Sequence, residues 1–436
     1  MKVRALGAVA ALALLAIAAW PAYIATQSKA LAAAPSPAPV TPDYLHRNAI
    51  VAVFEGDVRK NPDQLITRML ASQYLMRYRE TGNVGDLVRA EHMAKRSLQY
   101  QRRYNVNADM ALASALLSLH RFKGALAYAQ DAGAVEPWNG GALAQVASID
   151  LELGRYDDAR RSLRAVPASP EDDVAVATAQ ARYQELTGDI AQARRSLQRA
   201  MNSVDGVVDT PAEARAWYHF RDGELAWEAG DLAGAQRRFE EALAIFPDYP
   251  RAYNGLARLY WGQKRWREAL DAATRASDQI PLPETLGYKA DAQRALGDER
   301  GAQVTQDTIV AIERIGNAQR INDRALAVYY AEHGVRLADA IAIAQRDVAL
   351  RDDVFAEDTL AWALACSGRW HEAQAHARKA VALDTPDARL QYHAGVIAWH
   401  NGDMAEARRR LTSALGLNPQ FHPLYADDAR RLLQQM

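Results

Sequence analysis

The sequence predicts an all-α protein, a superhelical solenoid of antiparallel helix pairs. From about residue 43 onward Ala, Leu, Arg, Gln and Glu dominate, which favours helix, and the Val/Ile/Thr alternation typical of strands is scarce. An alanine also returns at spacings of 34, 34, 42, 34, 33, 38, 33 and 34 residues. The nine positions are Ala125, Ala159, Ala193, Ala235, Ala269, Ala302, Ala340, Ala373 and Ala407. A period near 34 residues is typical of repeated helix–turn–helix units.

When the repeats are aligned on these alanines, three further columns of the alignment contain the same kind of residue in most repeats. Glycine stands five residues earlier in six of the nine repeats, at Gly154, Gly188, Gly230, Gly297, Gly368 and Gly402. An apolar residue stands three earlier in eight, at Phe122, Tyr156, Ile190, Leu232, Trp266, Leu337, Trp370 and Met404. Proline stands twelve later in four, at Pro137, Pro247, Pro281 and Pro419. Only 25 of the 436 residues are glycine, so chance would place fewer than one in that column.

Each column has a physical reason. The glycine ends the first helix of a unit, because a left-handed residue there lets the chain reverse. The apolar residue opens the second helix and packs back on the first, and the small alanine lets two helices approach closely. The proline ends the second helix, since proline cannot continue one. Such a unit cannot bury its apolar face alone, so the repeats must stack.

Two spacings and both ends depart from the period. The extra residues near 202–211 are rich in Gly, Asp and Pro, and we expect a loop there. The four extra residues near 311–323 predict longer or irregular helices. Residues 63–100 read as a first, irregular repeat with Gly82 and Asn83 in its turn, and residues 422–436 as an amphipathic cap.

The N-terminus reads as an export signal. Lys2 and Arg4 precede an uncharged run of 22 residues, 5–26, which is at the threshold for spanning a membrane. Small-x-small patterns at 30–34 also suit signal peptidase. We therefore expect a signal anchor or signal peptide over 1–34, a Pro-rich linker over 35–42, and the solenoid over 43–436. The body then faces the periplasm, anchored to the inner membrane or free if the signal is cleaved.

Composition narrows the class of function. There are 52 Lys and Arg against 53 Asp and Glu, so the net charge is −1 and gives no electrostatic footprint for nucleic acid. The single cysteine, Cys366, allows no intrachain disulfide and no cysteine zinc knuckle. Hydrophobic residues at 49% and charged residues at 24% exclude global disorder.

The repeat columns resemble the tetratricopeptide repeat (TPR) family over roughly residues 60–420. The fullest match is Gly223-Glu224, Gly230-Asp231-Leu232, Ala235, Phe239, Ala242 and Pro247, and the next is Gly395, Gly402, Ala407, Leu411, Ala414 and Pro419. The segment DTLAWALACSGRWHEA (358–373) resembles TPR proteins common in bacteria. The resemblance implies about nine or ten repeats with a C-terminal capping helix, in a protein of the bacterial cell envelope.

The resemblance also implies a binding groove. In the family, positions 2, 5, 9 and 12 of the first helix line the concave surface, and their spacing makes one helical stripe. These positions give the expected partner-binding residues Arg251, Asn254, Arg258, Trp261, Trp227, Glu224, Trp217, Trp362 and Trp399. Arginine, asparagine and tryptophan suit a peptide or a carboxylate. The competing interpretation is that the tryptophans pack between helices and the arginines solvate the edge.

Motifs for catalysis or metal binding are weak. In HEAQAH, His371 and His376 are five residues apart and cannot share a helix face, as a zinc protease requires. Histidines gather in the last two repeats without a recognisable ligand set. No phosphate loop or nucleophile elbow occurs. We therefore expect no catalytic residue, no metal and no cofactor.

These observations predict a non-enzymatic scaffold, exposed outside the cytoplasm, that binds a protein or peptide partner in a concave groove. We expect the protein to contact the membrane only through its N-terminal segment, and we do not expect it to bind nucleic acid. An assembly factor for a secretion, pilus or polysaccharide-export apparatus is the alternative within this class. An enzyme with an unrecognised site is the rival class. A scaffold should show a continuous groove, whereas an enzyme should show a closed pocket with converging ionisable groups.

Overall fold

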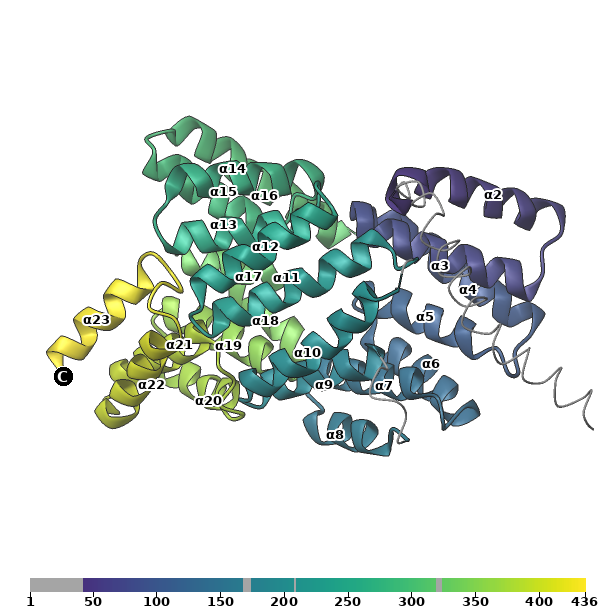
Figure 1. Cartoon of the computed structure of the whole chain (residues 1–436). Helices are drawn as coiled ribbons and strands as arrows, with labels where there is room; N and C mark the ends of the chain where they lie inside the picture. Colours follow the sequence, from purple (N-terminus) through teal and green to yellow (C-terminus); the bar gives the residue numbers. More distant parts are fainter. Residues whose placement is uncertain (1–41, 168–173, 208, 319–323) are drawn as a thin grey trace, which may run out of the picture. The chain divides into compact units, whose positions relative to one another are not determined.

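The protein is all helical, as predicted. The computed structural model describes residues 42–167, 174–207, 209–318 and 324–436, which form a 3-10 turn, η1 (Asp43–His46), and 22 α-helices, with no strand within those ranges (Figure 1). The expected export signal at 1–34 and nearly all of the linker lie outside the described residues. Among the helices of the described ranges, none is both long and apolar enough to cross a membrane.

The described helices form ten consecutive pairs between a first helix, α2 (Arg47–Lys60), and a last one, α23 (Tyr425–Gln435). The first members of the pairs are α3 (Gln64–Thr81), α5 (Val106–Ser118), α7 (Gly140–Glu152), α9 (Val174–Leu186), α11 (Ala212–Glu228), α13 (Pro250–Gly262), α15 (Pro283–Ala295), α17 (Arg324–Glu332), α19 (Val354–Cys366) and α21 (Ala388–His400). The second members are α4 (Val84–Tyr100), α6 (Phe122–Val135), α8 (Tyr156–Ala165), α10 (Ile190–Asp205), α12 (Leu232–Ile245), α14 (Trp266–Gln279), α16 (Glu299–Ala318), α18 (Leu337–Leu350), α20 (Trp370–Ala380) and α22 (Met404–Leu417).

The turn inside each of the nine aligned repeats contains a left-handed residue. All six predicted glycines have positive φ, between 74° and 96°. Where the column lacks glycine, His120 and Lys264 adopt φ of 58° and 59° themselves, and Gly334 supplies φ 62° one position earlier. The reversal between two antiparallel helices therefore requires this conformation even where a side chain makes it costly.

The other columns are confirmed as well. Each of the nine anchor alanines is at most 1% exposed, as close helix packing requires. In all nine repeats the second helix begins three residues before its alanine. The helices before the four prolines end two residues ahead of them.

One local expectation was wrong, and another is confirmed. Residues 202–205 were expected in a loop, but α10 continues through Asp205, because Met201 and Val204 extend its buried face by one more turn. The insertion near 311–323 lengthens α16 to 20 residues, as expected.

Later repeats fold back against earlier ones. The backbone N–H of Val354 donates to the Tyr156 hydroxyl at 2.9 Å, and Thr385 Oγ1 donates to the carbonyl of Leu186 at 2.7 Å. Asn418 Nδ2 donates to the carbonyl of Trp227 at 2.9 Å. These partners are 198, 199 and 191 residues apart, about six repeats. One hydrophobic core accordingly runs from Ala147 to Leu432, and the inner face of the middle repeats is partly enclosed.

A pair of helical glycines tests this long-range packing. Gly262 is the last residue of α13, and a Cβ there would overlap the carbonyl oxygen of Gln420. A Cβ at Gly416 in α22 would meet nothing within 4 Å. Both have ordinary helical φ, so alanine should stabilise an open site by up to about 1 kcal/mol. We expect Gly416→Ala to keep or raise the melting temperature and Gly262→Ala to lower it. Equal effects of the two substitutions on thermal unfolding would contradict the packing of α13 against residue 420.

Candidate binding groove

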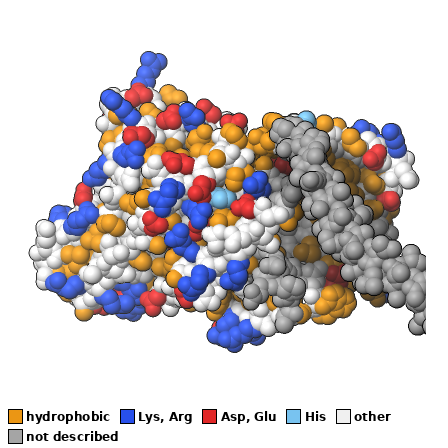
Figure 2. Space-filling view, viewed as in Figure 1, with side chains coloured by type: hydrophobic (Ala, Val, Ile, Leu, Met, Phe, Trp, Pro, Cys, Tyr) orange, Lys and Arg blue, Asp and Glu red, His pale blue; other side chains and the backbone are white. Residues whose placement is uncertain are grey.

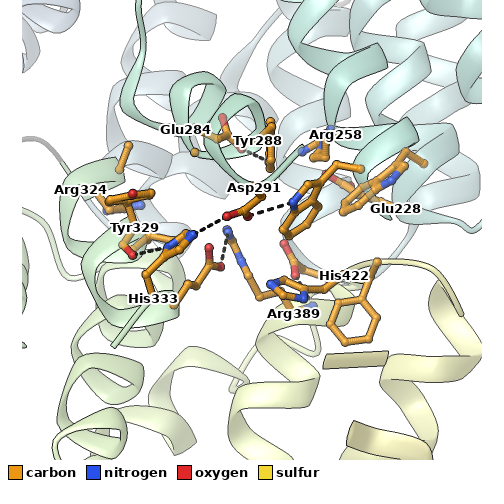
Figure 3. A pocket seen from close by; sticks show the side chains of 18 residues that line it. Glu228, Arg258, Glu284, Tyr288, Asp291, Arg324, Tyr329, His333, Arg389 and His422 are labelled. Carbon is orange, nitrogen blue, oxygen red and sulfur yellow. Dashed lines mark hydrogen bonds and ion pairs between the residues drawn. The ribbon is translucent and has the colours of Figure 1, made fainter. Parts of the chain in front are cut away.

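Two adjoining cavities open on the inner face of the middle repeats. The larger has a volume of about 740 Å³ and is lined mainly by α9, α11, α13 and the start of α15. The smaller, of about 310 Å³, is lined by α11, α13, α15 and α17, by the beginning of α21, and by residues 421 and 422 (Figure 3). Five residues line both: Glu228, Arg258, Glu284, Asp387 and Arg389. The two cavities therefore form one continuous concavity, called here the inner groove.

Seven of the nine residues expected from the sequence line the inner groove. The larger cavity contains Trp217, Glu224, Arg251, Asn254 and Arg258, and the smaller contains Trp227, Arg258 and Trp261. The structure thus brings the stripe positions of α11 and α13 together.

Trp362 and Trp399 line neither cavity. Trp362 is 7% exposed and stacks on His393, with ring centroids 4.0 Å apart. Trp399 meets the edge of His400 at 4.7 Å. For these two tryptophans the packing interpretation describes what the structure shows.

Arg258 occupies the boundary between the cavities. Its guanidinium carbon lies 4.1 Å from the centroid of the Trp227 ring, a cation–π contact. Its Nη2 pairs with Glu224 at 3.4 Å, and Arg221 pairs with the same carboxylate. Burial raises the pKa of the Glu224 carboxyl, but the charges of Arg221 and Arg258 outweigh burial and hold that pKa below its ordinary value. Glu224 therefore stays ionised and fixes both guanidinium groups.

Trp261 is held on every side. It is 5% exposed, its indole Nε1 donates to Asp291 at 3.0 Å, and its ring lies 5.0 Å from Tyr288 and 4.4 Å from His422. This side chain closes one wall of the smaller cavity and contributes a packed surface rather than a free edge.

His333 lies in the smaller cavity between two hydrogen-bond acceptors. Its Nε2 lies 2.9 Å from Asp291, and its Nδ1 lies 2.8 Å from the carbonyl oxygen of Tyr329 (Figure 3). Both ring nitrogens face acceptors, which favours the imidazolium form. Burial lowers the pKa of His333, yet Asp291 and that carbonyl raise it by more, so the pKa lies above its ordinary value. His422 differs, because burial places its pKa well below the ordinary value.

Several groove residues were not predicted from the sequence. They come from α17, from the start of α21 and from the segment before α23, and include Arg324, Glu332, Asp387, Arg389 and His422. They lie about 60–200 residues from the α11 and α13 stripes, and each is ordinary within its own repeat. No local pattern could have selected them, because the stacking of successive repeats places α17 beside α15, and the later repeats bring the start of α21 and His422 to the same cavity.

The chemistry available for catalysis or metal binding is limited. Burial raises the pKa of Cys366 to about 12, so the thiol is protonated at neutral pH and is a poor nucleophile. Over residues 42–167, 174–207, 209–318 and 324–436, no three His, Cys, Asp or Glu side chains are grouped to hold a metal ion.

Comparisons with known proteins agree with the fold. Models of the tetratricopeptide repeat match residues 116–183, 226–290 and 359–420. No curated protein matches this sequence at a significant level. Tetratricopeptide repeats generally bind protein or peptide partners and are generally not enzymes.

Among solved structures, similar chains include PilW, a type IV pilus biogenesis factor, with 20% identity over 48% of this chain and 94% of that chain, TM-score 0.40. The Pseudomonas aeruginosa pilF product has 16% identity over 52% and 97%, TM-score 0.39. Human IFIT1, as a dimer with PPP-AAAA, has 14% identity over 85% and 87%, TM-score 0.46. At such identities and TM-scores these likenesses carry no conclusion about what this chain does. With its repeat matches, its helix pairs and its left-handed turns, this chain contains tetratricopeptide repeats over residues 116–183, 226–290 and 359–420.

Proposed function

We propose that this protein is a non-enzymatic scaffold that binds an extended segment of a partner protein in the inner groove. The observation that supports this most is the concavity itself, which brings aromatic rings and charged side chains from α11, α13 and α15 to one continuous surface. Aromatic anchors beside arginines are the residues that most often dominate binding energy at protein interfaces.

The ionisable groups of the groove favour binding over catalysis. The smaller cavity does have the converging charges expected of an enzyme, but most of them are already paired, as in Arg389 with Glu332 and His333 with Asp291. Pairs of this kind hold each group in its ordinary charge state instead of leaving it poised for proton transfer.

The charge distribution suits a protein partner. Figure 2 shows Lys and Arg intermingled with Asp and Glu over the visible face, with no broad basic stripe. In the larger cavity, six arginines and six carboxylates line the described surface. A mixed surface of this kind recognises a segment by local complementarity and does not attract phosphate backbones over a distance.

The location proposed for the body is outside the cytoplasm, on the outer face of a bacterial-type inner membrane. The support is the basic N-terminus followed by the apolar run at 5–26. A partner in the same compartment, including a component of a secretion, pilus or polysaccharide-export apparatus, then becomes the natural occupant of the groove.

Two tryptophans should separate binding from stability. Trp217 is partly exposed in the larger cavity, whereas Trp261 is buried and hydrogen-bonded. Peptides that bind the full-length chain are first selected from a random display library. We expect Trp217→Ala to weaken the binding of these peptides by about 2 kcal/mol without unfolding the protein. Trp261→Ala should lower stability by about 3 kcal/mol, measured by thermal unfolding. Normal peptide binding by a folded Trp217→Ala variant would place the partner elsewhere.

Arg251 tests the electrostatic part of the groove. It is exposed in the larger cavity and has no ion pair with the described residues. We expect Arg251→Glu to weaken a selected peptide that carries an acidic residue about tenfold at low salt, and less at high salt because of screening. Arg237→Glu, an equally exposed arginine on α12 outside both cavities, is the matched control. Equal losses for the two variants would indicate a non-specific charge effect.

Export can be tested directly. Alkaline phosphatase fused after residue 60 folds to an active enzyme only outside the cytoplasm, so the fusion should be active. The same fusion without residues 2–26 should be inactive. A fusion to a reporter that works only in the cytoplasm should show the opposite pattern, and its activity at this junction would refute export.

A further inference from the structure

The smaller cavity has an excess of negative charge. Its described lining holds five carboxylates, which are Glu228, Glu284, Asp291, Glu332 and Asp387. It holds three guanidinium groups, which are Arg258, Arg324 and Arg389, and the charged His333. The balance is negative before the partners of each group are considered.

Two of the three arginines are neutralised from outside the cavity. Arg324 pairs with Asp347 and Asp353 at 2.5 Å, and neither of these carboxylates lines the cavity. Arg258 pairs with Glu224, which lines only the larger cavity. The positive charges left for the carboxylates of the lining are therefore Arg389 and His333.

Arg389 and His333 are each already paired with a carboxylate of the lining. Arg389 pairs with Glu332 at 3.6 Å, and His333 pairs with Asp291 at 2.9 Å (Figure 3).

Three carboxylates of the described lining remain without a cationic partner. Glu284 accepts from the Tyr288 hydroxyl at 2.7 Å, and Asp387 accepts from backbone N–H groups at the start of α21. Glu228 has no hydrogen bond or ion pair with the described residues. Burial, followed by the charge of Glu185, raises the pKa of Glu228 well above its ordinary value, so the empty cavity favours the protonated carboxyl and a cation placed beside it would favour the ionised form.

The walls of the cavity suit an organic cation. Trp227, Trp261, Tyr288 and Tyr329 all line it, and aromatic rings attract ammonium and guanidinium groups, as the Trp227 ring already does with Arg258. Trp227 is 8% exposed, and its indole Nε1 has no hydrogen-bond partner among the described residues, nor has the Nε of Arg258. Buried donors of this kind require an acceptor, and the carbonyl oxygens of an extended peptide provide one.

We propose that the smaller cavity takes up the lysine or arginine side chain of a bound partner segment, with its charge against Glu228 and the adjoining backbone carbonyls accepting from Trp227 and Arg258. The proposal rests on the proposed binding role of the inner groove and specifies what it selects. A volume of about 310 Å³ is at the lower end for small-ligand pockets and has room for one long side chain with some water. A cationic side chain gains an ion pair with the ionised form of Glu228, whereas a neutral side chain does not, so the cavity discriminates by charge.

Small probes test the cavity without an identified partner. Nα-acetyl-lysine amide and Nα-acetyl-arginine amide are titrated into the full-length chain by calorimetry, beside Nα-acetyl-norleucine amide, a neutral analogue of similar length, and Nα-acetyl-glutamate amide. The cationic amides should bind at least about tenfold more tightly than the other two. Equal binding of the lysine and norleucine amides, or preference for the glutamate amide, would overturn the proposal.

Glu228→Gln keeps the size of the side chain and removes its charge. This variant should lose at least about tenfold in affinity for the cationic amides, while its melting temperature stays the same or rises because burial disfavours the ionised form of Glu228 and the amide cannot ionise. Glu372→Gln, on the exposed side of α20 and outside both cavities, should bind as the wild type does. Unchanged affinity in a folded Glu228→Gln variant would refute the role of Glu228.

The display library separates this proposal from the broader one. If peptides bind to the inner groove but contain no fixed basic residue, the scaffold role stands and the cation site is wrong. If the cationic amides bind selectively but no peptide is recovered, the cavity is a cation site and the groove does not bind extended segments.

Discussion

The contact between repeats that lie about 200 residues apart is the constraint on which the inner groove depends. Tyr156, Leu186 and Trp227 each bond with a residue six repeats later. These bonds join backbone or buried groups of one turn of the superhelix to the next, so they leave little freedom for the two turns to slide. The same contact between distant repeats requires glycine at positions 230 and 262, because a side chain there would meet the backbone of residues 417 and 420. Without this contact, the start of α21 and residues 421 and 422 would not close the cavity beside α11 and α13.

Enclosure changes the electrostatics of the inner face. On an open solenoid, arginines and carboxylates along a stripe are screened by water and contribute little. Here they are partly buried and depend on one another: Glu224 holds Arg221 and Arg258, and Arg258 in turn covers the Trp227 ring. The same burial makes an incomplete pairing expensive, which is why the unpaired Glu228 is informative about a ligand whereas the surface pair of Arg369 with Glu372 is not.

Residues that the sequence placed on one stripe proved to have different surroundings. Trp217, Trp261 and Trp362 stand at the second, twelfth and ninth positions of the first helix in their repeats, all on the stripe. Yet Trp217 lines the wide part of the groove, Trp261 is packed into a wall, and Trp362 is stacked on His393 away from both cavities. Stripe position determines that a side chain points to the inner side of its helix. The neighbour supplied by a distant repeat determines whether that side chain meets solvent or another ring.

The sequence alone determined the fold class, the register of the nine aligned repeats and the ends of their helices. These features follow from local chemistry: left-handed turns, small residues at close helix contacts, and prolines that stop helices. It did not determine that α10 continues to Asp205, since Gly, Asp and Pro in the insertion indicated a loop while the buried Met201 and Val204 extended the helix. Only the tertiary structure decided the composition of the groove, including Glu332, Arg389 and His422, because small rotations between successive repeats add up over two to five units before those residues meet α11 and α13.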